Sequence, residues 1–356
     1  MKALVFYEFK EGCVEIRDVP VPEIGPDDVL IRVKAAAICG SDVERIHCHS
    51  ESTVTPVIIG HEFCGVVEKV GANVTRWKPG DRAVSDNTGY LCGECYACST
   101  GRFLNCPERR LIGGKLDGGF AEFVRLPGDV LKLYPKSLMP LPENLSFEEG
   151  AILEPSANAY YAVIQEGGLE LGQNVAIFGP GCIGLFATAW ARLGGAANII
   201  LVGGSKARLE FGGKLGAHHL INYRELDGTV TEAVENLVGK NRIDLIVDCA
   251  GGRNVLTDSI AMARSGARIV KLGWAGTETV NLNPAMRKGV EIIGHLGYNS
   301  LSWDRVIRLA SLGMLDFKQF ITAVFPLDRW REAFQGMEER KYVKAVFNSF
   351  SYTEAT

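Results

Sequence analysis

Four cysteines at short intervals form the first group of residues that could do chemistry. They are Cys92, Cys95, Cys98 and Cys106, in the pattern Cys-x2-Cys-x2-Cys-x7-Cys. Four thiolates complete a tetrahedral shell around Zn²⁺ and leave no position for a substrate, as in structural zinc sites. The regular spacing makes a chance cluster of reduced thiols the weaker explanation. Since no Lys/Arg-rich face surrounds the cluster, a nucleic-acid-binding ribbon is also disfavoured, and the pattern predicts a structural zinc site.

A second group mixes ligand types and is scattered along the chain. It comprises Cys39, the pair His61 and Glu62, and Glu154. Each residue alone has an ordinary structural explanation, such as a thiol that packs as a small apolar residue. Together, a thiol, an imidazole and carboxylates from distant loops can hold Zn²⁺ and leave one position open for water or a substrate oxygen. The combination predicts a catalytic zinc site.

A glycine-rich turn lies between a predicted strand and a predicted helix. Its sequence is Gly179-Pro180-Gly181-Cys182-Ile183-Gly184. The first two glycines permit a tight turn and the close approach of a pyrophosphate to the helix N-terminus, and the third lets the helix pack on the sheet. A lone motif of this kind is weak evidence. The strand before it and the helix after it favour a dinucleotide-binding site over a turn that binds nothing.

The next predicted strand, at 198–203, ends without an acidic residue. NAD-binding proteins place an Asp or Glu there to accept hydrogen bonds from the ribose hydroxyls, whereas this sequence has Gly203. Ser205, Lys206 and Arg208 follow and could donate to a 2′-phosphate. We therefore predict that NADP is preferred over NAD. The alternative is that Lys206 and Arg208 are solvated residues on the first turns of a helix.

These candidate sites fall in segments with different patterns of strands and helices. Short strands separated by Gly, Pro, Asn and Asp predominate in the first 150 residues, which is typical of a closed or rolled-up sheet. After Pro155, apolar strands alternate with helices, which predicts a parallel doubly wound sheet. The predicted strands are 174–179, 198–203, 218–222, 243–249, 267–272 and 291–294, and the predicted helices are 182–193, 206–215, 229–238 and 254–264. Beyond about residue 295 amphipathic helices are predicted at 303–312 and 329–339.

Composition excludes several classes of protein. A chain of 356 residues suggests two domains, and the net charge of −4 gives no reason to expect binding to nucleic acid or to an anionic membrane. The N-terminal sequence meets charged residues too early for a signal peptide, and no apolar run approaches the roughly 18 residues of a membrane span. Without a secretion signal, the 10 cysteines favour reduced thiols and metal ligation over disulfides. We expect a cytoplasmic protein.

Several motifs in one order make a family resemblance specific. They are Gly60-His61-Glu62-x2-Gly65-x-Val67, Gly80-Asp81-Arg82-Ala83-Val84, the four-cysteine loop, Leu153-Glu154-Pro155 and the glycine-rich turn. On these motifs the chain resembles the zinc-containing medium-chain dehydrogenase/reductase family, and within it the polyol (sorbitol-type) dehydrogenase branch. The resemblance covers residues 1 to about 348.

The resemblance implies an α/β plus β fold with an inserted nucleotide-binding domain. A GroES-like β-barrel catalytic domain (1–153) would be followed by a Rossmann domain with a doubly wound parallel sheet (154–294), and a C-terminal segment (295–356) would rejoin the catalytic domain. The active cleft would lie between the two domains. The family also implies a homodimer or homotetramer.

The same resemblance assigns roles to the candidate residues. Cys39, His61 and Glu62 would ligate a catalytic zinc, with Glu154 as a direct or water-bridged fourth partner, so that each chain holds two Zn²⁺ ions. Ser41 corresponds to the hydroxyl that accepts the substrate proton. Asp42 either orients His61 or forms an Asx turn.

Two positions depart from the family pattern. The histidine that ends the family's proton relay is replaced by Glu44, whose carboxylate could still relay a proton, although with a different pKa. Sorbitol dehydrogenases carry an Arg-Tyr pair where this chain has Gly297 and Tyr298. The loss of the arginine argues against plain sorbitol and leaves room for a bulkier or cyclic polyol. Tyr298 either contacts the substrate or packs under the domain interface.

These observations predict a zinc-dependent oxidoreductase. It would transfer hydride between a nicotinamide cofactor and a secondary alcohol or ketone of a small molecule, namely a sugar alcohol, a cyclitol or an amino-cyclitol. L-threonine 3-dehydrogenase and simple alcohol dehydrogenase are the alternatives within the same chemistry. A non-catalytic nucleotide-binding scaffold is the remote alternative.

Overall fold

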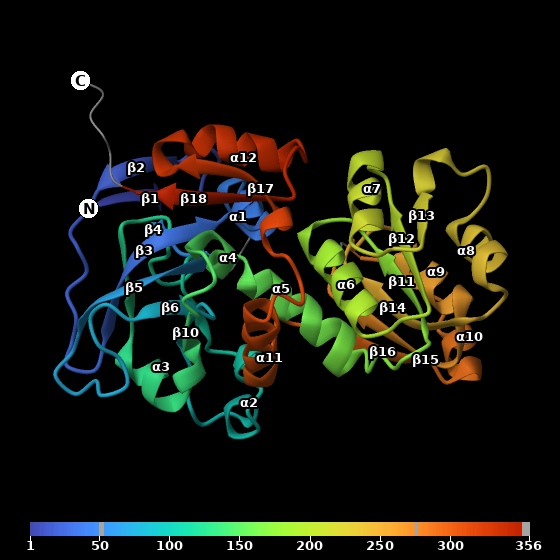
Figure 1. Cartoon of the computed structure of the whole chain (residues 1–356), viewed down its shortest axis with the longest axis horizontal. Helices are drawn as coiled ribbons and strands as arrows, with labels where there is room; N and C mark the ends of the chain where they lie inside the picture. Colours follow the sequence, from blue (N-terminus) through green and yellow to red (C-terminus); the bar gives the residue numbers. More distant parts are fainter. Residues whose placement is uncertain (50–52, 275–276, 351–356) are drawn as a thin grey trace. The chain divides into compact units, whose positions relative to one another are not determined.

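The computed structural model describes residues 1–49, 53–274 and 277–350 (Figure 1). The chain divides into two compact units, one containing Met1–Glu154 and Ile307–Thr356 and the other containing Pro155–Val306. The divisions fall within helices α5 (Leu153–Tyr160) and α11 (Ser300–Ser311). Within the described part of the chain, no helix is long and apolar enough to cross a membrane.

The first unit is built mainly from antiparallel strands. Its largest sheet contains β3 (Val29–Ala37), β5 (Glu62–Val70), β6 (Arg82–Ser85), β9 (Phe123–Leu126), β10 (Leu138–Pro140), β17 (Ile321–Pro326) and β18 (Lys344–Ser349). The order is β10-β6-β5-β3-β18-β17, and β9 also pairs with β3. A smaller sheet has the order β2-β1-β4, from β1 (Lys2–Phe6), β2 (Val14–Asp18) and β4 (Val57–Ile58), and β7 (Thr88–Tyr90) pairs with β8 (Arg110–Leu111).

Short helices complete this unit. They are α1 (Gly40–Ile46), α2 (Tyr96–Ser99), α3 (Gly128–Leu133), α4 (Phe147–Ala151) and α12 (Trp330–Glu338). The central strand β3 is apolar throughout except for Arg32 and Lys34, the two residues of the strand that are exposed. Two residues of β18, Val346 and Phe347, pair antiparallel with the end of β3. The last strand of the chain therefore completes a sheet that begins near residue 29.

The second unit is a six-stranded parallel sheet with helices. Its strands are β11 (Asn174–Phe178), β12 (Asn198–Gly203), β13 (His219–Asn222), β14 (Ile243–Asp248), β15 (Ala263–Lys271) and β16 (Glu291–Gly294), in the order β13-β12-β11-β14-β15-β16. Its helices are α6 (Cys182–Leu193), α7 (Lys206–Lys214), α8 (Val230–Val238), α9 (Val255–Met262) and α10 (Asn283–Lys288). This is the strand order of a dinucleotide-binding sheet, in which ligands bind at the carboxyl ends of the strands. The predicted doubly wound sheet is confirmed.

Most predicted elements of this unit agree with the structure to within a residue or two. The strand predicted at 267–272 is the exception, because β15 already begins at Ala263, within the end of the helix predicted at 254–264, and Ala263 pairs with Ile243 of β14. Pairing with β14 thus overrides the local helical pattern. The helix α6 is buried nearly all round, since its small and apolar residues pack on the sheet. Its Trp190 is 1% exposed and donates its indole N–H to the carbonyl of Ser156 at 3.1 Å.

Candidate functional site

The four cysteines predicted to bind zinc come together within the loop that joins β7 to β8, called the four-cysteine loop below. One ligand sulfur from each of Cys92, Cys95, Cys98 and Cys106 lies within 4.8 Å of the others. The Cys92 sulfur lies 3.9 Å from that of Cys98 and 3.6 Å from that of Cys106. Zinc–sulfur bonds of about 2.3 Å in a tetrahedron place two sulfurs about 3.8 Å apart. The spacing of the thiols therefore fits a Zn²⁺ ion.

Backbone groups near the cluster change the pKa of its thiols. Hydrogen bonds from the backbone N–H groups of Cys95 and Glu94 lower the pKa of Cys92 to about 7. Burial instead raises the pKa of Cys98 to about 12. The thiolate is the form that binds metals, so the lowered pKa of Cys92 favours metal binding near neutral pH.

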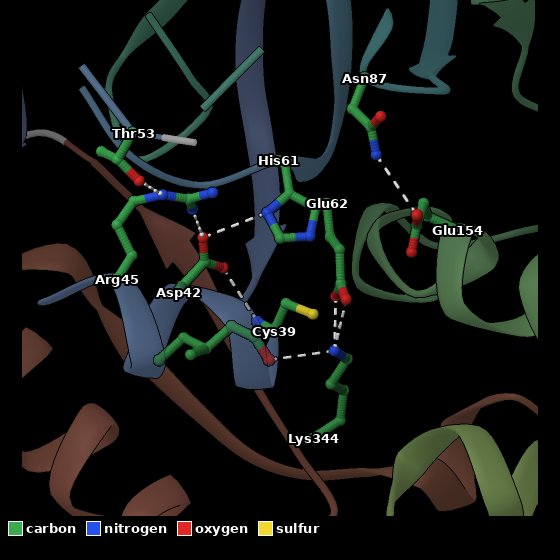
Figure 2. Close-up of polar contacts among 10 residues, drawn as sticks. Cys39, Asp42, Arg45, Thr53, His61, Glu62, Asn87, Glu154 and Lys344 are labelled. Carbon is green, nitrogen blue, oxygen red and sulfur yellow. Dashed lines mark hydrogen bonds and ion pairs between the residues drawn. The ribbon is translucent and has the colours of Figure 1, made fainter. Parts of the chain in front are cut away.

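The mixed group comes together where two strands of the first unit lie side by side. Ala37, at the end of β3, pairs with Glu62, at the start of β5, so Cys39 lies close to His61 and Glu62. One ligand atom from each of these three residues lies within 4.8 Å of the others (Figure 2). Gly60 precedes the pair with φ +94°, and a Cβ there would lie 2.4 Å from the ring of Phe120. Only glycine fits at that turn.

Asp42 fixes the orientation of His61 from the first turn of α1. Its Oδ1 lies 3.1 Å from His61 Nδ1 and accepts from Arg45 at 3.1 Å, and its Oδ2 accepts from the backbone N–H of Cys39 at 3.0 Å (Figure 2). A carboxylate can only accept, so Nδ1 carries the proton and Nε2 is left as the metal-binding atom. Asp42 therefore contacts the histidine, and its bond to Cys39 is the capping-box bond at the start of α1, not the Asx turn that was the alternative.

Charges at this group favour a protonated histidine while no metal is bound. Burial lowers the pKa of His61, but the negative charges of Asp42 and Cys39 outweigh it and hold this pKa well above its usual value. Burial likewise raises the pKa of Asp42, and the charges of His61 and Arg45 more than reverse this, so that the pKa is lowered. Metal binding at His61 must therefore displace a proton.

Glu62 is paired with a buried lysine from the last strand. Lys344 of β18 lies 2.7 Å from Glu62 Oε1 and 2.6 Å from Oε2, and it also donates to the carbonyl of Ile38 at 3.0 Å (Figure 2). Sequence reasoning missed this residue. The signal that could have found it is a lysine inside the apolar run Val343-Lys344-Ala345-Val346-Phe347.

Glu154 lies beside this group but is not part of the cluster that the described residues form within 4.8 Å. Its Oε1 accepts a hydrogen bond of 3.3 Å from the side-chain amide of Asn87 (Figure 2). Burial raises the pKa of Glu154 to about 7, and the nearby charge of Glu62 adds to the effect. Thiol, imidazole and carboxylate are donors that suit Zn²⁺, and three of them leave a further position for a substrate. The donor set thus fits the catalytic ion that the sequence predicts.

The two proposed proton-transfer residues lie on α1. Ser41 is half-buried and Glu44 is exposed, and their spacing of three residues puts them on one face of the helix. Nearby, His47 Nδ1 lies 2.8 Å from Glu11 and Nε2 lies 2.8 Å from Glu338. Both ring nitrogens of His47 are thereby engaged away from Glu44.

In the second unit, the glycine-rich turn has the geometry expected for a dinucleotide. Gly179 has φ +92°, and a Cβ on Gly184 would lie 1.9 Å from the carbonyl oxygen of Gly179. Gly181 is the N-cap of α6, which begins at Cys182 and Ile183. The N-terminus of α6 thus opens at the carboxyl end of β11, which is the place where dinucleotide-binding sheets in general hold a pyrophosphate.

At the end of β12 there is little space for an acidic side chain, and the guanidinium of Arg224 lies close by. A Cβ on Gly203 would lie 2.4 Å from Pro180, and a Cβ on Gly204 would lie 2.6 Å from Tyr223 Oη and 2.9 Å from Arg224 Nε. Sequence reasoning missed Tyr223 and Arg224, because they follow β13 and reach this point only through the pairing of Gly203 with Asn222. Of the residues predicted to bind here, Ser205 is the N-cap of α7, Lys206 is exposed on its first turn and Arg208 is half-buried.

Tyr298 packs within the second unit. It is 4% exposed, and its ring lies 5.4 Å from that of Trp303 in an edge-on arrangement. Gly297 before it has φ +71°, a conformation that favours glycine over the arginine of sorbitol dehydrogenases. The contact of Tyr298 with a substrate stays a prediction.

Comparison with known proteins identifies the family. The model described as an alcohol dehydrogenase GroES-like domain matches residues 25–136, and the model described as a zinc-binding dehydrogenase matches residues 182–311. The chain is 36% identical over 353 residues to YdjL of Escherichia coli K12, an uncharacterized zinc-type alcohol dehydrogenase-like protein, covering 97% of this chain and 98% of the relative. It is 33% identical to D-arabitol-phosphate dehydrogenase of Enterococcus avium, covering 93% of each chain.

A solved structure agrees with these relatives. A zinc-binding dehydrogenase from Sinorhizobium meliloti 1021, bound to NADP, superposes with a TM-score of 0.88 at 30% identity and covers 98% of each chain. The chain therefore belongs to the zinc-containing medium-chain dehydrogenase/reductase family, in its polyol (sorbitol-type) branch, and is an NAD(P)-dependent alcohol dehydrogenase.

Proposed function

We propose that the protein oxidises a secondary alcohol of a sugar alcohol, cyclitol or amino-cyclitol, or reduces the matching ketone, with NADP preferred over NAD. The observation that carries the proposal is the cluster of half-buried Cys39 with buried His61 and Glu62, in which Asp42 contacts His61 Nδ1. A glycine-rich turn of dinucleotide-binding geometry in the same chain supplies the site for a hydride acceptor. A homodimer or homotetramer is the assembly we expect from the family.

In the proposed mechanism the protein holds two zinc ions. The thiols of Cys92, Cys95, Cys98 and Cys106 would hold the structural ion, and Cys39, His61 Nε2 and Glu62 would hold the catalytic ion, with Glu154 as its outer partner. Zinc at this site supplies Lewis-acid polarisation of the substrate oxygen, and the nicotinamide exchanges the hydride.

The side chains of α1 then handle the proton. The hydroxyl of Ser41 accepts the proton of the substrate alcohol, and Glu44, on the same face and exposed, passes it to water. Asp42 keeps Nδ1 of His61 protonated throughout, so the imidazole does not compete for that proton.

Gly297 supports a substrate larger than a linear polyol. Its left-handed backbone disfavours the arginine that sorbitol dehydrogenases use there, and the absent side chain leaves space. L-threonine 3-dehydrogenase and simple alcohol dehydrogenase activity are the alternatives. Both share the metal chemistry proposed here.

The preference for NADP rests on the end of β12. An acid at Gly203 would meet Pro180, and Arg224 lies against Gly204, where it joins Lys206 in offering positive charge to a 2′-phosphate. The similar dehydrogenase from Sinorhizobium meliloti was solved with NADP bound.

A substrate panel run with both cofactors tests the proposal. Polyols, cyclitols, amino-cyclitols, threonine and simple alcohols would each be assayed with NADP⁺ and NAD⁺, and zinc per chain would be counted by metal analysis. We expect two zinc ions and the highest kcat/KM with a polyol or cyclitol and NADP⁺. A preference for threonine or ethanol would contradict the proposed substrate class, and a strong preference for NAD⁺ would contradict the proposed cofactor. One zinc ion and no turnover would favour the non-catalytic scaffold.

A further inference from the structure

A line of hydrogen bonds joins the base of the four-cysteine loop to Glu154. The guanidinium of Arg109 donates to Asn87 Oδ1 at 2.6 Å. Asn87 Nδ2 in turn donates to Glu154 Oε1 at 3.3 Å, the bond that Figure 2 shows. All three residues belong to the first unit.

The chemistry of Arg109 fixes the direction of this line. An amide oxygen and nitrogen look alike in most structures, so the orientation of an Asn side chain has to be assigned from its partners. A guanidinium has only donors, so the atom of Asn87 that faces Arg109 must be the oxygen. The amide N–H group of Asn87 is then the one presented to Glu154.

Asn87 is held in place by its own backbone. It is 2% exposed with φ +64°, its N–H donates to Ser85 Oγ at 3.0 Å, and its carbonyl accepts from Ile112 at 2.9 Å. These contacts fix the backbone of Asn87, and the hydrogen bond from Arg109 to Oδ1 at 2.6 Å holds its buried side chain. The position of its amide is therefore set by the fold and not by Glu154.

Arg109 is in turn tied to the four-cysteine loop. Its backbone N–H donates to the carbonyl of Cys106 at 3.0 Å, and its Nε donates to Thr88 Oγ1 at 3.2 Å. The strands β7 and β8 enter and leave this loop and pair with each other, with Thr88 opposite Leu111. Closing the loop by its four thiols thus holds Arg109 and Asn87 at a fixed separation.

We propose that Asn87 and Arg109 are positioning residues that orient the carboxylate of Glu154 toward the Cys39–His61–Glu62 group. The inference rests on the proposed function, because it gives Glu154 a part at the catalytic metal. A buried carboxylate beside Glu62 would otherwise turn away from a like charge. The donated hydrogen bond of Asn87 holds it close enough to serve the metal or its bound water.

Zinc affinity of the catalytic site tests this inference directly. Asn87→Asp keeps the shape and tolerates the left-handed backbone, but it places an oxygen against Glu154 in place of the N–H donor. Arg109→Gln removes the anchoring cation. Arg110→Gln is the matched control, because Arg110 is the next residue, is exposed, and has its guanidinium over the ring of Tyr90.

Competition with a chelator would measure zinc affinity, and the visible absorption of the Co²⁺-substituted enzyme would report the coordination. We expect Asn87→Asp and Arg109→Gln to weaken the catalytic site about tenfold or more and to shift its Co²⁺ bands. The four-thiol site and Arg110→Gln should match the wild type. In a Glu154→Gln background, Asn87→Asp should have no further effect, because it acts through Glu154.

Either of two results would overturn this inference without affecting the proposed function. One is a wild-type Co²⁺ spectrum and zinc affinity in both variants, and the other is a full additional loss when Asn87→Asp is combined with Glu154→Gln. The proposed function fails separately, and the inference with it, if the wild-type protein itself binds one zinc ion and turns over no substrate.

Discussion

The ammonium of Lys344 lies 2.7 Å from Glu62 Oε1 and 2.6 Å from Oε2, and the two side chains are 2% and 0% exposed. Removing one partner of such a buried ion pair lowers the stability of the folded protein, because the remaining charge is left without compensation. Glu62 is also a proposed metal ligand. Lys344 and Zn²⁺ therefore act on the same carboxylate.

Lys344→Met should destabilise the zinc-free protein more than the zinc-loaded protein. Loss of one partner of a buried pair costs about 3–5 kcal/mol, and a bound Zn²⁺ would offset part of it by compensating Glu62. Urea unfolding of both forms would measure the two costs. Lys341→Met is the control, since its ion pair with Glu339 is exposed, and equal costs with and without zinc would argue that Glu62 is not a ligand.

Asp42→Asn should weaken the catalytic zinc site. The variant offers an amide to His61 and loses the charge that balances Arg45, and loss of such an outer partner typically lowers metal affinity about 10–100-fold. Chelator competition on the purified protein measures this. Asp81→Asn, which alters a turn carboxylate bonded to the backbone of Lys78, should bind zinc as the wild type does. No difference between the two variants would remove Asp42 from the metal site.

Glu44→Ala should slow alcohol oxidation near neutral pH. General acid–base groups contribute about 10²–10⁴-fold, and an exposed carboxylate shared with water lies at the lower end of that range. The measurement is the pH dependence of kcat/KM for the best substrate of the panel. An unchanged pH–rate profile would show that the proton leaves Ser41 by another route.

Arg224→Ala should weaken NADPH binding and leave NADH binding unchanged. A charge-assisted hydrogen bond to a phosphate contributes about 1.5–3 kcal/mol, which corresponds to about tenfold or more in Kd. Titration of nucleotide fluorescence gives both constants. Arg242→Ala is the control, because Arg242 precedes β14 and so lies at the amino ends of the parallel strands, whereas Arg224 lies near the carboxyl end of β12. Equal losses for the two nucleotides would place Arg224 away from the 2′-phosphate.

His47 should stabilise the protein at mildly acidic pH and lose this effect as the pH rises. Hydrogen bonds to Glu338 and Glu11 raise the pKa of His47 above its usual value, so the folded state binds the proton more tightly than the unfolded state. The contribution is full below the unfolded pKa of about 6.5 and vanishes above the raised pKa.

His47→Gln tests this contribution. Since the histidine side chain is 32% exposed, we expect at most about 1 kcal/mol. The measurement is the difference in Tm between the wild type and His47→Gln across pH 6 to 9. A difference that grows toward alkaline pH would contradict the assignment.

The parts of this molecule that sequence could predict are those encoded locally. The four cysteines lie within one loop, and the strands of the second unit are short apolar runs whose bounds follow from the residues themselves. The group of Cys39, His61 and Glu62 could not be predicted from one local pattern, since only the order of several motifs indicated that these residues meet. Their ligand roles stay predictions.

The remaining features depend on which strands lie side by side. Lys344 reaches Glu62 because β18 pairs with β3, and Arg224 reaches Gly204 because β13 pairs with β12. Asn87 and Arg109 meet through the pairing of β7 with β8. Residues that act across a strand pair carry no local pattern, so a single sequence does not show them.

The position of β18 has a consequence for how the protein is made. The chain leaves the ribosome from its N-terminus, so the Rossmann unit, contiguous from Pro155 to Val306, can complete its sheet during synthesis. The catalytic unit cannot complete its sheet so early, because β18 lies between β3 and β17 and is synthesised after the whole Rossmann unit. Until β18 is made, Glu62 lacks its ion-pair partner Lys344, and β3 lacks the strand with which its end pairs. Synthesis of β18 is thus the step that allows this part of the catalytic unit to assemble.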